Sequence, residues 1–435
     1  MKFFSTRGNS APLSFSDALQ QGLAPDGGLY IPETWPAFNA SDFDGAQSLA
    51  QVAEILLAPF LVDDPLAPEL SDIVSEAFNF LAPLRALPAA ANATLSVLEL
   101  HHGPTAAFKD FGARFLAACF SRLRSVEAST LNILVATSGD TGGAVAAAFH
   151  RRPHIEVTVL FPRGLVSPTQ ERQLTCWGDN VRSFAVEGSF DDCQRLVKAA
   201  FLDTELRAHR QLSSANSINL GRLLPQMVYY AMSSLEHWRT HQSSLNFIIP
   251  SGNLGNAAAC VWTRRLGLPI GEIVLGHNAN KTVPDYLISG LWRPRPSVAT
   301  LASAMDVGNP SNMERLQTLW PDVDHLRQQL RAFSVTDEQI RTRIRHDYQF
   351  LGQIWCPHTA VAAEVWHQHI AQTGGNWCLV ATASPAKFPE IVEPLIGVEV
   401  PVPVSLAELL DRPTHVESLS ADMAALRSAL MTSEG

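Results

Sequence analysis

Cysteines in metal-binding patterns, basic residues and long apolar runs are all in short supply in this 435-residue sequence. The six cysteines form neither a CxxC pair nor a Cys/His spacing that would bind a metal ion, and Cys356 with His358 alone does not make a site. We therefore expect reduced, buried thiols, a cytoplasmic location and no metal. The apolar start at residues 1–4 ends at Ser5, which argues against a signal peptide. No apolar run is long enough to cross a bilayer, so we expect no membrane partner.

Acidic residues outnumber basic ones by 42 to 32, which gives a net charge of −10. Nucleic acids bind to basic surfaces, and the sequence contains no basic run, so we expect no nucleic-acid partner. A hydrophobic content of 46% and a charged content of 17% are typical of a globular protein. The length predicts two or three domains.

One lysine, Lys109, stands in an apolar stretch after a Gly-Pro turn. Alanines and phenylalanines on both sides predict a helix with a buried face. Burial makes the charged form of an amine costly, which lowers its pKa and leaves the amine free to act as a nucleophile, as a Schiff-base lysine must. Taken alone, the stretch slightly favours the alternative, a lysine that reaches solvent beside Asp110 and Arg114.

Two Gly-rich polar turns follow apolar runs elsewhere in the chain. Residues 137–143 follow the run 131–136, and residues 250–256 follow the run 247–249. Each pattern predicts a strand, a turn and an Ala-rich helix whose first backbone amides bind an anion, phosphate above all. Two such turns and one activatable lysine indicate a phosphate-bearing cofactor held covalently by the lysine. Pyridoxal 5′-phosphate fits this description best.

Strands and helices alternate over most of the chain after residue 93, which indicates parallel α/β sheets. We predict strands at 96–100, 132–136, 156–161, 182–186, 246–249, 272–276 and 377–381, and a short one before residue 216. A capping box at 189–192 predicts a helix start. We also predict a helix at 323–332 and one or two helices beyond residue 406. Residues 1–92 predict a small domain without catalytic groups, joined by a linker at 88–92.

Several motifs of the sequence resemble those of the threonine synthase family, whose members are pyridoxal-phosphate-dependent enzymes of fold-type II. The resemblance is carried by residues 104–110, 138–142, 251–256 and 381–388. Residues 23–32 and 306–312 resemble the longer threonine synthases, which have an additional N-terminal domain. The resemblance extends from near the start of the chain to about residue 401.

The resemblance implies an α/β fold of the tryptophan-synthase-β type, with two parallel-sheet domains and a small N-terminal domain. The implied bounds are 1–92 for the N-terminal threonine synthase domain and 93–435 for the catalytic region, in which a smaller subdomain at about 129–221 is inserted in the larger domain. It also implies a monomer, with a homodimer as the alternative.

The resemblance assigns the cofactor site to residues of these motifs. Lys109 would carry pyridoxal 5′-phosphate. The cup for the cofactor phosphate would be formed by Gly252, Asn253, Leu254, Gly255 and Asn256. Asp140 would lie beside the cofactor's 3′-oxygen, where we expect a shared proton, and Thr382 would face the pyridine nitrogen. Without the motifs, these two would be a turn-capping residue and a structural strand-end residue. His101 or His102 is an alternative base.

The substrate phosphate needs its own cation. Arg222 is the first candidate, because a planar guanidinium binds phosphate with two hydrogen bonds, and Lys281 and Lys387 are weaker candidates. Without the motif, Arg222 would be a solvated residue at a helix start. Hydroxyl and amide groups would assist it, from Thr105, Ser138, Thr141, Asn216 and Ser217. The residues of segment 306–312 do not by themselves indicate a role.

The resemblance implies a lyase that converts O-phospho-L-homoserine and water to L-threonine and phosphate, the last step of threonine biosynthesis. Three alternatives stay open. They are another fold-type II enzyme (a serine/threonine dehydratase or an amino-acid phospho-lyase), a nucleotide-binding protein, and a non-catalytic protein that binds pyridoxal phosphate. The nucleotide-binding alternative lacks both GK[ST] and a GxGxxG after a strand.

Overall fold

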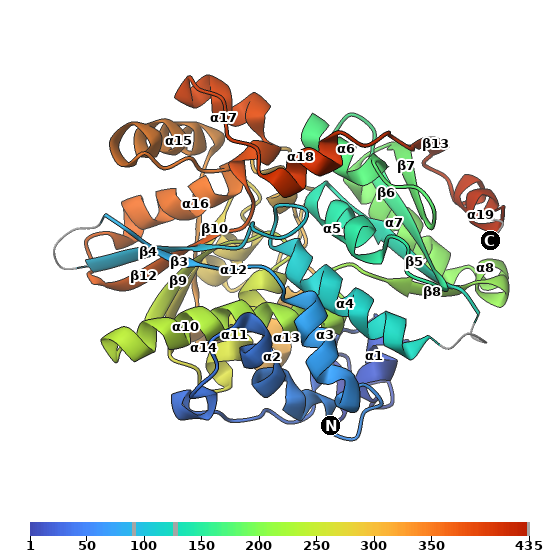
Figure 1. Cartoon of the computed structure of the whole chain (residues 1–435), viewed down its shortest axis with the longest axis horizontal. Coiled ribbons are helices and arrows are strands. Elements are labelled where there is room, and N and C mark those ends of the chain that lie inside the picture. The colour runs from blue at the N-terminus through green and yellow to red at the C-terminus, as the bar shows by residue number, and fades with distance from the viewer. Residues whose placement is uncertain (89–92, 125–128, 433–435) are drawn as a thin grey trace.

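The computed structural model describes residues 1–88, 93–124 and 129–432. It contains a larger sheet and a smaller sheet that lie side by side, with the N-terminal helices at the bottom of the view, below the helices that cover the sheets (Figure 1). The linker expected at 88–92 falls almost entirely outside the described residues, as does the domain boundary at residue 92.

The larger sheet has six strands in the order β11-β10-β9-β12-β4-β3. All neighbours are parallel except β3, which runs antiparallel to β4 at the edge. The strands are β3 (Leu84–Leu87), β4 (Ala93–Glu99), β9 (Leu245–Pro250), β10 (Ile270–His277), β11 (Arg331–Ser334) and β12 (Gly375–Ala381). The prediction of one helix over 323–332 is wrong at its end, since that helix stops at Gln329 and β11 begins at Arg331.

The smaller sheet has five parallel strands in the order β13-β7-β6-β5-β8. They are β5 (Leu131–Ala136), β6 (Ile155–Pro162), β7 (Val181–Glu187), β8 (Gln211–Ser214) and β13 (Glu417–Ser420). All six residues of β5 are buried, as expected of a central parallel strand covered on both faces. The tail beyond residue 406 was predicted as helix alone, but β13 returns it to this sheet beside β7.

Helices cover both faces of each sheet (Figure 1). Helix α16 packs on β9, β10 and β12, while α10 and α11 lie over the opposite face, and α7 packs on β5 and β6 with α19 outside it. The helices of the catalytic region are α4 (Lys109–Leu123), α5 (Asp140–Phe149), α6 (Pro168–Thr175), α7 (Phe190–Leu202), α8 (Thr204–His209), α9 (Leu220–Leu223), α10 (Met227–His241), α11 (Gly255–Arg265), α12 (Thr282–Ser289), α13 (Met313–Leu319), α14 (Val323–Gln329), α15 (Asp337–Leu351), α16 (Pro357–Val365), α17 (Pro389–Ile396), α18 (Val404–Leu410) and α19 (Met423–Met431). The predicted capping box is present at the start of α7.

The N-terminal region packs against the catalytic region through one continuous apolar core. The N-terminal region consists of the antiparallel pair β1 (Phe3–Ser5) and β2 (Tyr30–Pro32) with α1 (Phe15–Gln21), α2 (Leu49–Leu57) and α3 (Leu70–Ala77). Helix α2 lies on α10 and α3 lies on α4. The rings of Trp35 and Trp262 meet edge to face with their centroids 5.0 Å apart. This packing orients the helix that begins at Lys109.

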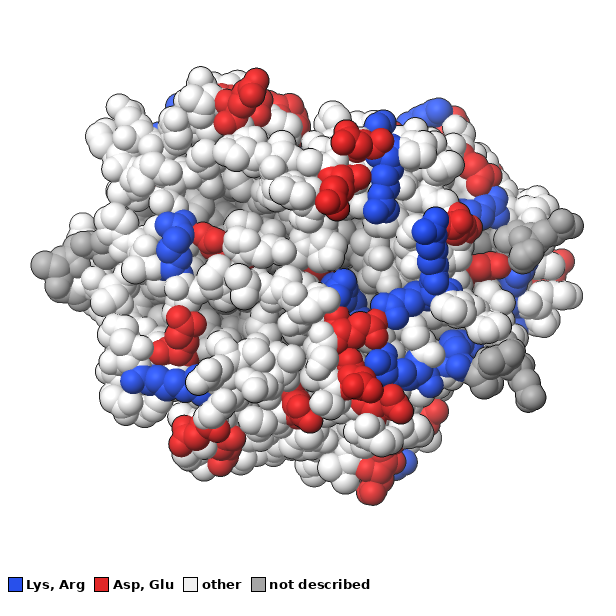
Figure 2. All heavy atoms as spheres, in the orientation of Figure 1, with Lys and Arg blue, Asp and Glu red and all other residues white. Residues whose placement is uncertain are grey.

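The surface carries both signs of charge. Acidic and basic side chains are interspersed on the face shown in Figure 2, mainly over its right half. None of the described helices is long and apolar enough to cross a membrane.

Candidate active site

A pocket lies where the carboxyl ends of strands from both sheets face each other, which is where ligands bind in open α/β sheets. It is lined by the turns that follow β5, β8, β9 and β12 and by the start of α4. Thirteen of the fourteen site residues expected from the sequence line it: Lys109, Ser138, Asp140, Thr141, Asn216, Ser217, Arg222, Gly252, Asn253, Leu254, Gly255, Asn256 and Thr382.

Lys109 is the first residue of α4 and presents its amine to this pocket. Within the described part of the chain the amine has no hydrogen bond or ion pair, and it lies 4.5 Å from the centre of the Phe108 ring. Burial, assisted by the nearby Arg222 and opposed by Asp140, lowers the pKa of Lys109 to about 8. About a tenth of the amine is therefore uncharged at pH 7, far more than for an exposed lysine, and this fraction can act as a nucleophile.

The loop between β9 and α11 has the geometry of an anion cradle. Leu254 adopts a left-handed backbone with φ of 62° directly before the helix, so the first amides of α11 are left for a ligand. Gly252 lies so close to the backbone at Met305 that a Cβ on residue 252 would stand 2.9 Å from the Cα of Met305. The Asn256 Oδ1 accepts hydrogen bonds from Tyr229 and Tyr230, while its buried Nδ2 has no partner in the described chain.

The structure gives a role to segment 306–312, whose residues alone had indicated none. The Asn312 Nδ2 donates to the Asn253 carbonyl at 2.9 Å, and the Ser311 amide donates to the Asn253 Oδ1 at 3.2 Å. Asp306 anchors the other end of the segment, where its carboxylate accepts from Asn278 and from the Thr300 hydroxyl, both at 2.7 Å. The segment therefore fixes the shape of the loop before α11.

Asp140 begins α5 and forms a buried ion pair with Lys387. The Lys387 Nζ lies 2.7 Å from the Asp140 Oδ1, and the Gln170 Nε2 donates to the same oxygen at 3.0 Å. Burial alone would raise the pKa of Asp140, but Lys387 and, to a lesser degree, His358 outweigh it and lower this pKa to about 2. Asp140 is thus a carboxylate in this structure, and the proton expected between it and the cofactor's 3′-oxygen stays a prediction. Lys387, considered for the substrate phosphate, is already paired.

Arg222, in the short helix α9, is 1% exposed yet lines the pocket. One guanidinium nitrogen donates to the Ala215 carbonyl, and its Nε has no partner in the described chain. No carboxylate of the described residues pairs with it, and burial lowers its pKa only to about 10, so it keeps its charge at neutral pH. Next to it, the Asn216 Nδ2 donates to the Ala136 carbonyl at 2.9 Å, which joins the turns after β8 and β5.

Of the fourteen site residues expected from the sequence, Thr105 alone does not line the pocket, and the weaker candidates Lys281 and Lys387 do not line it either. The Thr105 hydroxyl donates to the Asp110 Oδ1 at 2.7 Å, and the Thr105 carbonyl accepts from the Lys387 Nζ at 2.9 Å. The alternative bases His101 and His102 border a separate hollow beside Glu99. Thr105 therefore holds the loop before Lys109 in place, while the Lys109 amine itself lines the pocket.

His358 is a pocket residue that sequence reasoning missed as a ligand group. It is the second residue of α16, follows Pro357, and is 3% exposed. Its Nε2 accepts from the Ala304 amide at 3.1 Å, and its Nδ1 has no partner in the described chain. The sequence signal for His358 was its position directly after Pro357, because a proline favours the first position of a helix and so places His358 at a helix start.

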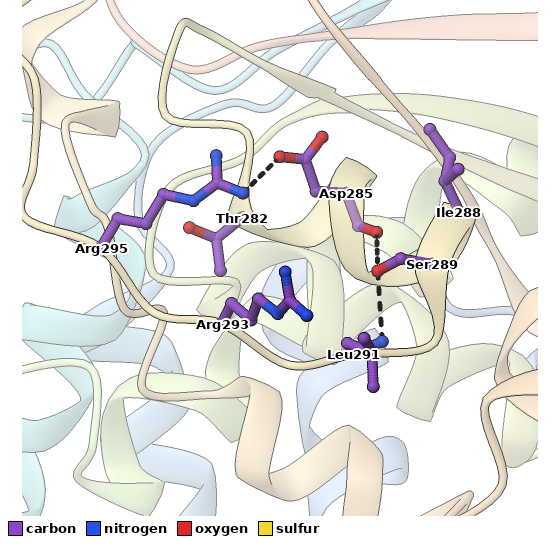
Figure 3. A pocket seen from close by; sticks show the side chains of 7 residues that line it. All are labelled: Thr282, Asp285, Ile288, Ser289, Leu291, Arg293 and Arg295. Atoms are coloured by element: carbon purple, nitrogen blue, oxygen red, sulfur yellow. Dashed lines mark hydrogen bonds and ion pairs between the residues drawn. The ribbon is translucent and has the colours of Figure 1, made fainter.

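A further hollow runs along α12 and the loop after it (Figure 3). Arg293 and Arg295 line it, and the Arg295 guanidinium pairs with Asp285 at 2.7 Å. Most of its lining residues are exposed, and they include no lysine, histidine or cysteine. The pocket at Lys109 is therefore the better candidate for chemistry.

Comparison with known proteins agrees with this geometry. Models described as Threonine synthase N terminus, Pyridoxal-phosphate dependent enzyme, and Threonine synthase, C-terminal match residues 2–78, 79–383 and 359–430. The threonine synthase of Serratia marcescens is 38% identical over 433 residues, which cover 99% of both chains. The chain belongs to the threonine synthase family. The crystal structure of threonine synthase from Escherichia coli matches with a TM-score of 0.91 at 37% identity over 100% of both chains.

Membership of the threonine synthase family confirms the fold-type II architecture with its two parallel-sheet domains and N-terminal domain. A threonine synthase structure from Brucella melitensis, described as bound to pyridoxal phosphate, matches with a TM-score of 0.89 and 34% identity over 99% of this chain and 98% of that one. The pocket fits this cofactor. It offers an unpaired lysine amine, a helix-start cradle with no room for a Cβ at Gly252, and the unpartnered donor of Asn256.

Proposed function

We propose that the protein catalyses the threonine synthase reaction, in which O-phospho-L-homoserine and water give L-threonine and phosphate, with pyridoxal 5′-phosphate held at Lys109. One observation carries the proposal. A single pocket joins an unpaired lysine amine, an anion cradle at a helix start, and a second cation, Arg222, which forms no ion pair with the residues that the structure describes. Identity of 38% over the full length of a curated threonine synthase supports it.

The pocket residues divide into groups that meet different parts of the cofactor. When bound, pyridoxal phosphate supplies a conjugated ring that accepts negative charge from the substrate Cα. Lys109 holds it covalently, and the cradle that includes Gly252 and Asn256 binds its phosphate. The Thr382 hydroxyl, which makes no hydrogen bond within the described residues, donates to the pyridine nitrogen. The ionised Asp140 accepts a hydrogen bond from the 3′-hydroxyl, since its own pKa of about 2 leaves it without a proton.

Arg222 binds the substrate phosphate. Its position at 1% exposure, with an unpartnered Nε, lets it meet an anion without first breaking an ion pair. The polar groups that assist it come from the turns after β5 and β8, namely Ser138, Thr141, Asn216 and Ser217. Charge-assisted hydrogen bonds to the γ-phosphate stabilise the charge that develops on this group as it leaves.

Lys109 also moves protons. When it is not bonded to the cofactor, the Lys109 amine would take the proton from the substrate Cα and return it at the end of the reaction. A pKa of about 8 suits both steps, because the amine is a base of moderate strength near neutral pH.

The finer assignments of partner and place are proposals as well. The substrate is a small molecule, and the protein acts as a monomer, with a homodimer as the alternative. The six cysteines are all free and buried, which favours the reducing cytoplasm over an oxidising compartment. The domain bounds of 1–92 and 93–435, with a subdomain at about 129–221, stay a prediction.

The test measures phosphate and threonine released from O-phospho-L-homoserine by purified holoenzyme, by Lys109→Ala and by Lys198→Ala. Lys198 is an exposed lysine on α7 and serves as the matched control. We expect equal amounts of phosphate and threonine from the wild type and from Lys198→Ala, and neither product from Lys109→Ala.

Two results would overturn the proposal in different ways. Phosphate accompanied by 2-oxobutyrate would make the protein a phospho-lyase that releases its intermediate before water adds. No phosphate from a protein that still binds pyridoxal phosphate would reject the substrate, and serine and threonine would then be tested as dehydratase substrates.

A further inference from the structure

A buried donor without a partner at the wall of a pocket indicates a contact with a ligand, because an unmade hydrogen bond in the interior costs free energy. Three residues of the active-site pocket carry such an atom within the described chain: Arg222 at Nε, Asn256 at Nδ2 and His358 at Nδ1. The first two are accounted for by the two phosphates of the proposed reaction. His358 has no part in that scheme.

The hydrogen bonds of His358 fix which of its ring nitrogens carries the proton. A backbone amide can only donate, so the Nε2 that faces the Ala304 amide at 3.1 Å must be the unprotonated acceptor. Burial, partly opposed by Asp140, lowers the pKa of His358 to about 4, so the ring is neutral at pH 7. The single ring proton therefore sits on Nδ1, and Nδ1–H is a donor without an acceptor.

His358 lines the same pocket as Lys109 and Asp140. The ring lies within the electrostatic reach of Asp140, Lys387 and Lys109. Its other side packs against the Phe388 ring, with centroids 5.0 Å apart. The Ala304 backbone that it holds precedes Met305, which closes over Gly252.

We propose that His358 is a ligand-binding residue whose Nδ1–H donates a hydrogen bond to an anionic oxygen of the bound ligand between Lys109 and Asp140. The oxygen belongs either to the cofactor or to the carboxylate of the amino-acid substrate. A neutral donor suits this position, because a second positive charge would repel the Lys387 ammonium that keeps Asp140 ionised. Only the identity of the acceptor depends on the proposed function, whereas the donor is a property of the chain.

Two substitutions separate the ligand role from a structural one. In His358→Asn the side-chain amide comes close to the place of Nδ1 and keeps a donor there, but nothing accepts from Ala304. In His358→Gln the amide reaches the place of Nε2 and keeps the acceptor for Ala304, but the Nδ1 donor is lost. Thermal unfolding of both variants controls for loss of the fold.

Pyridoxal phosphate binding to the apoenzyme and the kinetics with O-phospho-L-homoserine distinguish the two sources of the oxygen. If the acceptor is on the cofactor, we expect the Kd for pyridoxal phosphate to rise about tenfold in His358→Gln and to stay within about threefold in His358→Asn, as for loss of one hydrogen bond. If it is on the substrate, KM shows this pattern at saturating cofactor, and the Kd is unchanged.

The opposite order of effects, with His358→Asn the more impaired, would overturn the proposal and leave His358 as a support for Ala304. Equal values for both variants and the wild type would overturn it as well. Independently, ¹⁵N NMR of histidine-labelled apoenzyme must show a neutral ring protonated at Nδ1, assigned by its absence in the variants. An Nε2-protonated ring refutes the donor. Failure of the wild type to form threonine would reject the proposed function, while the cofactor-binding and NMR results would still decide the role of His358.

Discussion

The buried pair between Lys387 and Asp140 supports a prediction whose size follows from the structure. Both side chains are almost fully shielded from solvent, at 0% and 4% exposure, and the ammonium lies 2.7 Å from the carboxylate. Replacing Lys387 by methionine keeps the apolar stem of the side chain but removes the charge. Asp140 would then be a buried carboxylate whose main remaining partner is the neutral amide of Gln170.

The loss of stability can be bounded from two sides. The fall of the Asp140 pKa from 3.8 to about 2 corresponds to about 2 kcal/mol of stabilisation of the charged form. Leaving one charge of a buried pair without its partner costs about 3–5 kcal/mol. We therefore expect the free energy of unfolding of Lys387→Met to fall by about 2–5 kcal/mol at pH 8.

The pH dependence provides the sharper test. In the wild type the depressed pKa of Asp140 contributes stability above pH 4, and this is lost as pH falls from about 4 towards 2. In Lys387→Met the largest effect that lowers this pKa is gone, and His358 and the Gln170 hydrogen bond are each weaker than burial, so we expect the pKa of Asp140 to rise above its unfolded value. The folded state then binds the extra proton, so the variant recovers stability as pH falls.

Urea unfolding of the holoenzymes at pH 5 and pH 8 measures both effects, with Lys198→Met as the exposed control. The double variant Asp140→Asn/Lys387→Met carries neither charge and is expected to be more stable at pH 8 than Lys387→Met alone. A deficit below about 1 kcal/mol, or one that is no smaller at pH 5 than at pH 8, would refute the reasoning.

Three further predictions concern ligand binding. Arg222→Met removes the unpaired guanidinium, and we expect the KM for O-phospho-L-homoserine to rise at least tenfold with little change in cofactor affinity, measured by steady-state kinetics at saturating pyridoxal phosphate. Gly252→Ala places a Cβ 2.9 Å from the Met305 Cα, so the cradle must open, and the Kd for pyridoxal phosphate measured by fluorescence titration is expected to rise more than tenfold. Asp306→Ala removes the acceptor of the Thr300 hydroxyl and one of the acceptors of Asn278, so we expect a lower thermal midpoint and a Kd for the cofactor that rises about severalfold.

The sequence predicted the fold wherever strands are long and apolar. The runs that became β5, β6 and β9 have buried patterns that need no knowledge of their neighbours. By contrast, β11 and β13 have four residues each, with several exposed positions. They form strands because each pairs with the edge of a strand that is separated from it in the sequence, β10 for β11 and β7 for β13. Leu419 of β13 pairs with Val186, a partner that local periodicity cannot indicate.

The candidate site divides in the same way. Lys109 and the loop at Gly252 were assigned from motifs that resemble the family, since the stretch around Lys109 alone slightly favoured a lysine that reaches solvent. The pairing of Lys387 with Asp140 and the position of His358 were not, because each depends on a contact between elements far apart in the sequence. The cation that faces Asp140 is supplied by Lys387, a residue far away in the sequence, so only the fold shows it.

The same long-range reasoning explains why an N-terminal domain without catalytic groups belongs to this active site. Arg315, which is fully buried, donates to the Tyr30 carbonyl of β2 at 3.1 Å and to the Ile218 carbonyl beside the Arg222 turn at 2.7 Å. Its guanidinium also reaches the Asn312 side chain, which in turn holds the loop before α11. One cation thus ties the N-terminal domain to the turns proposed to bind both phosphates. Because no carboxylate pairs with Arg315 among the described residues, its charge is satisfied by oxygens of these three segments, and each segment is needed to keep the other two in place.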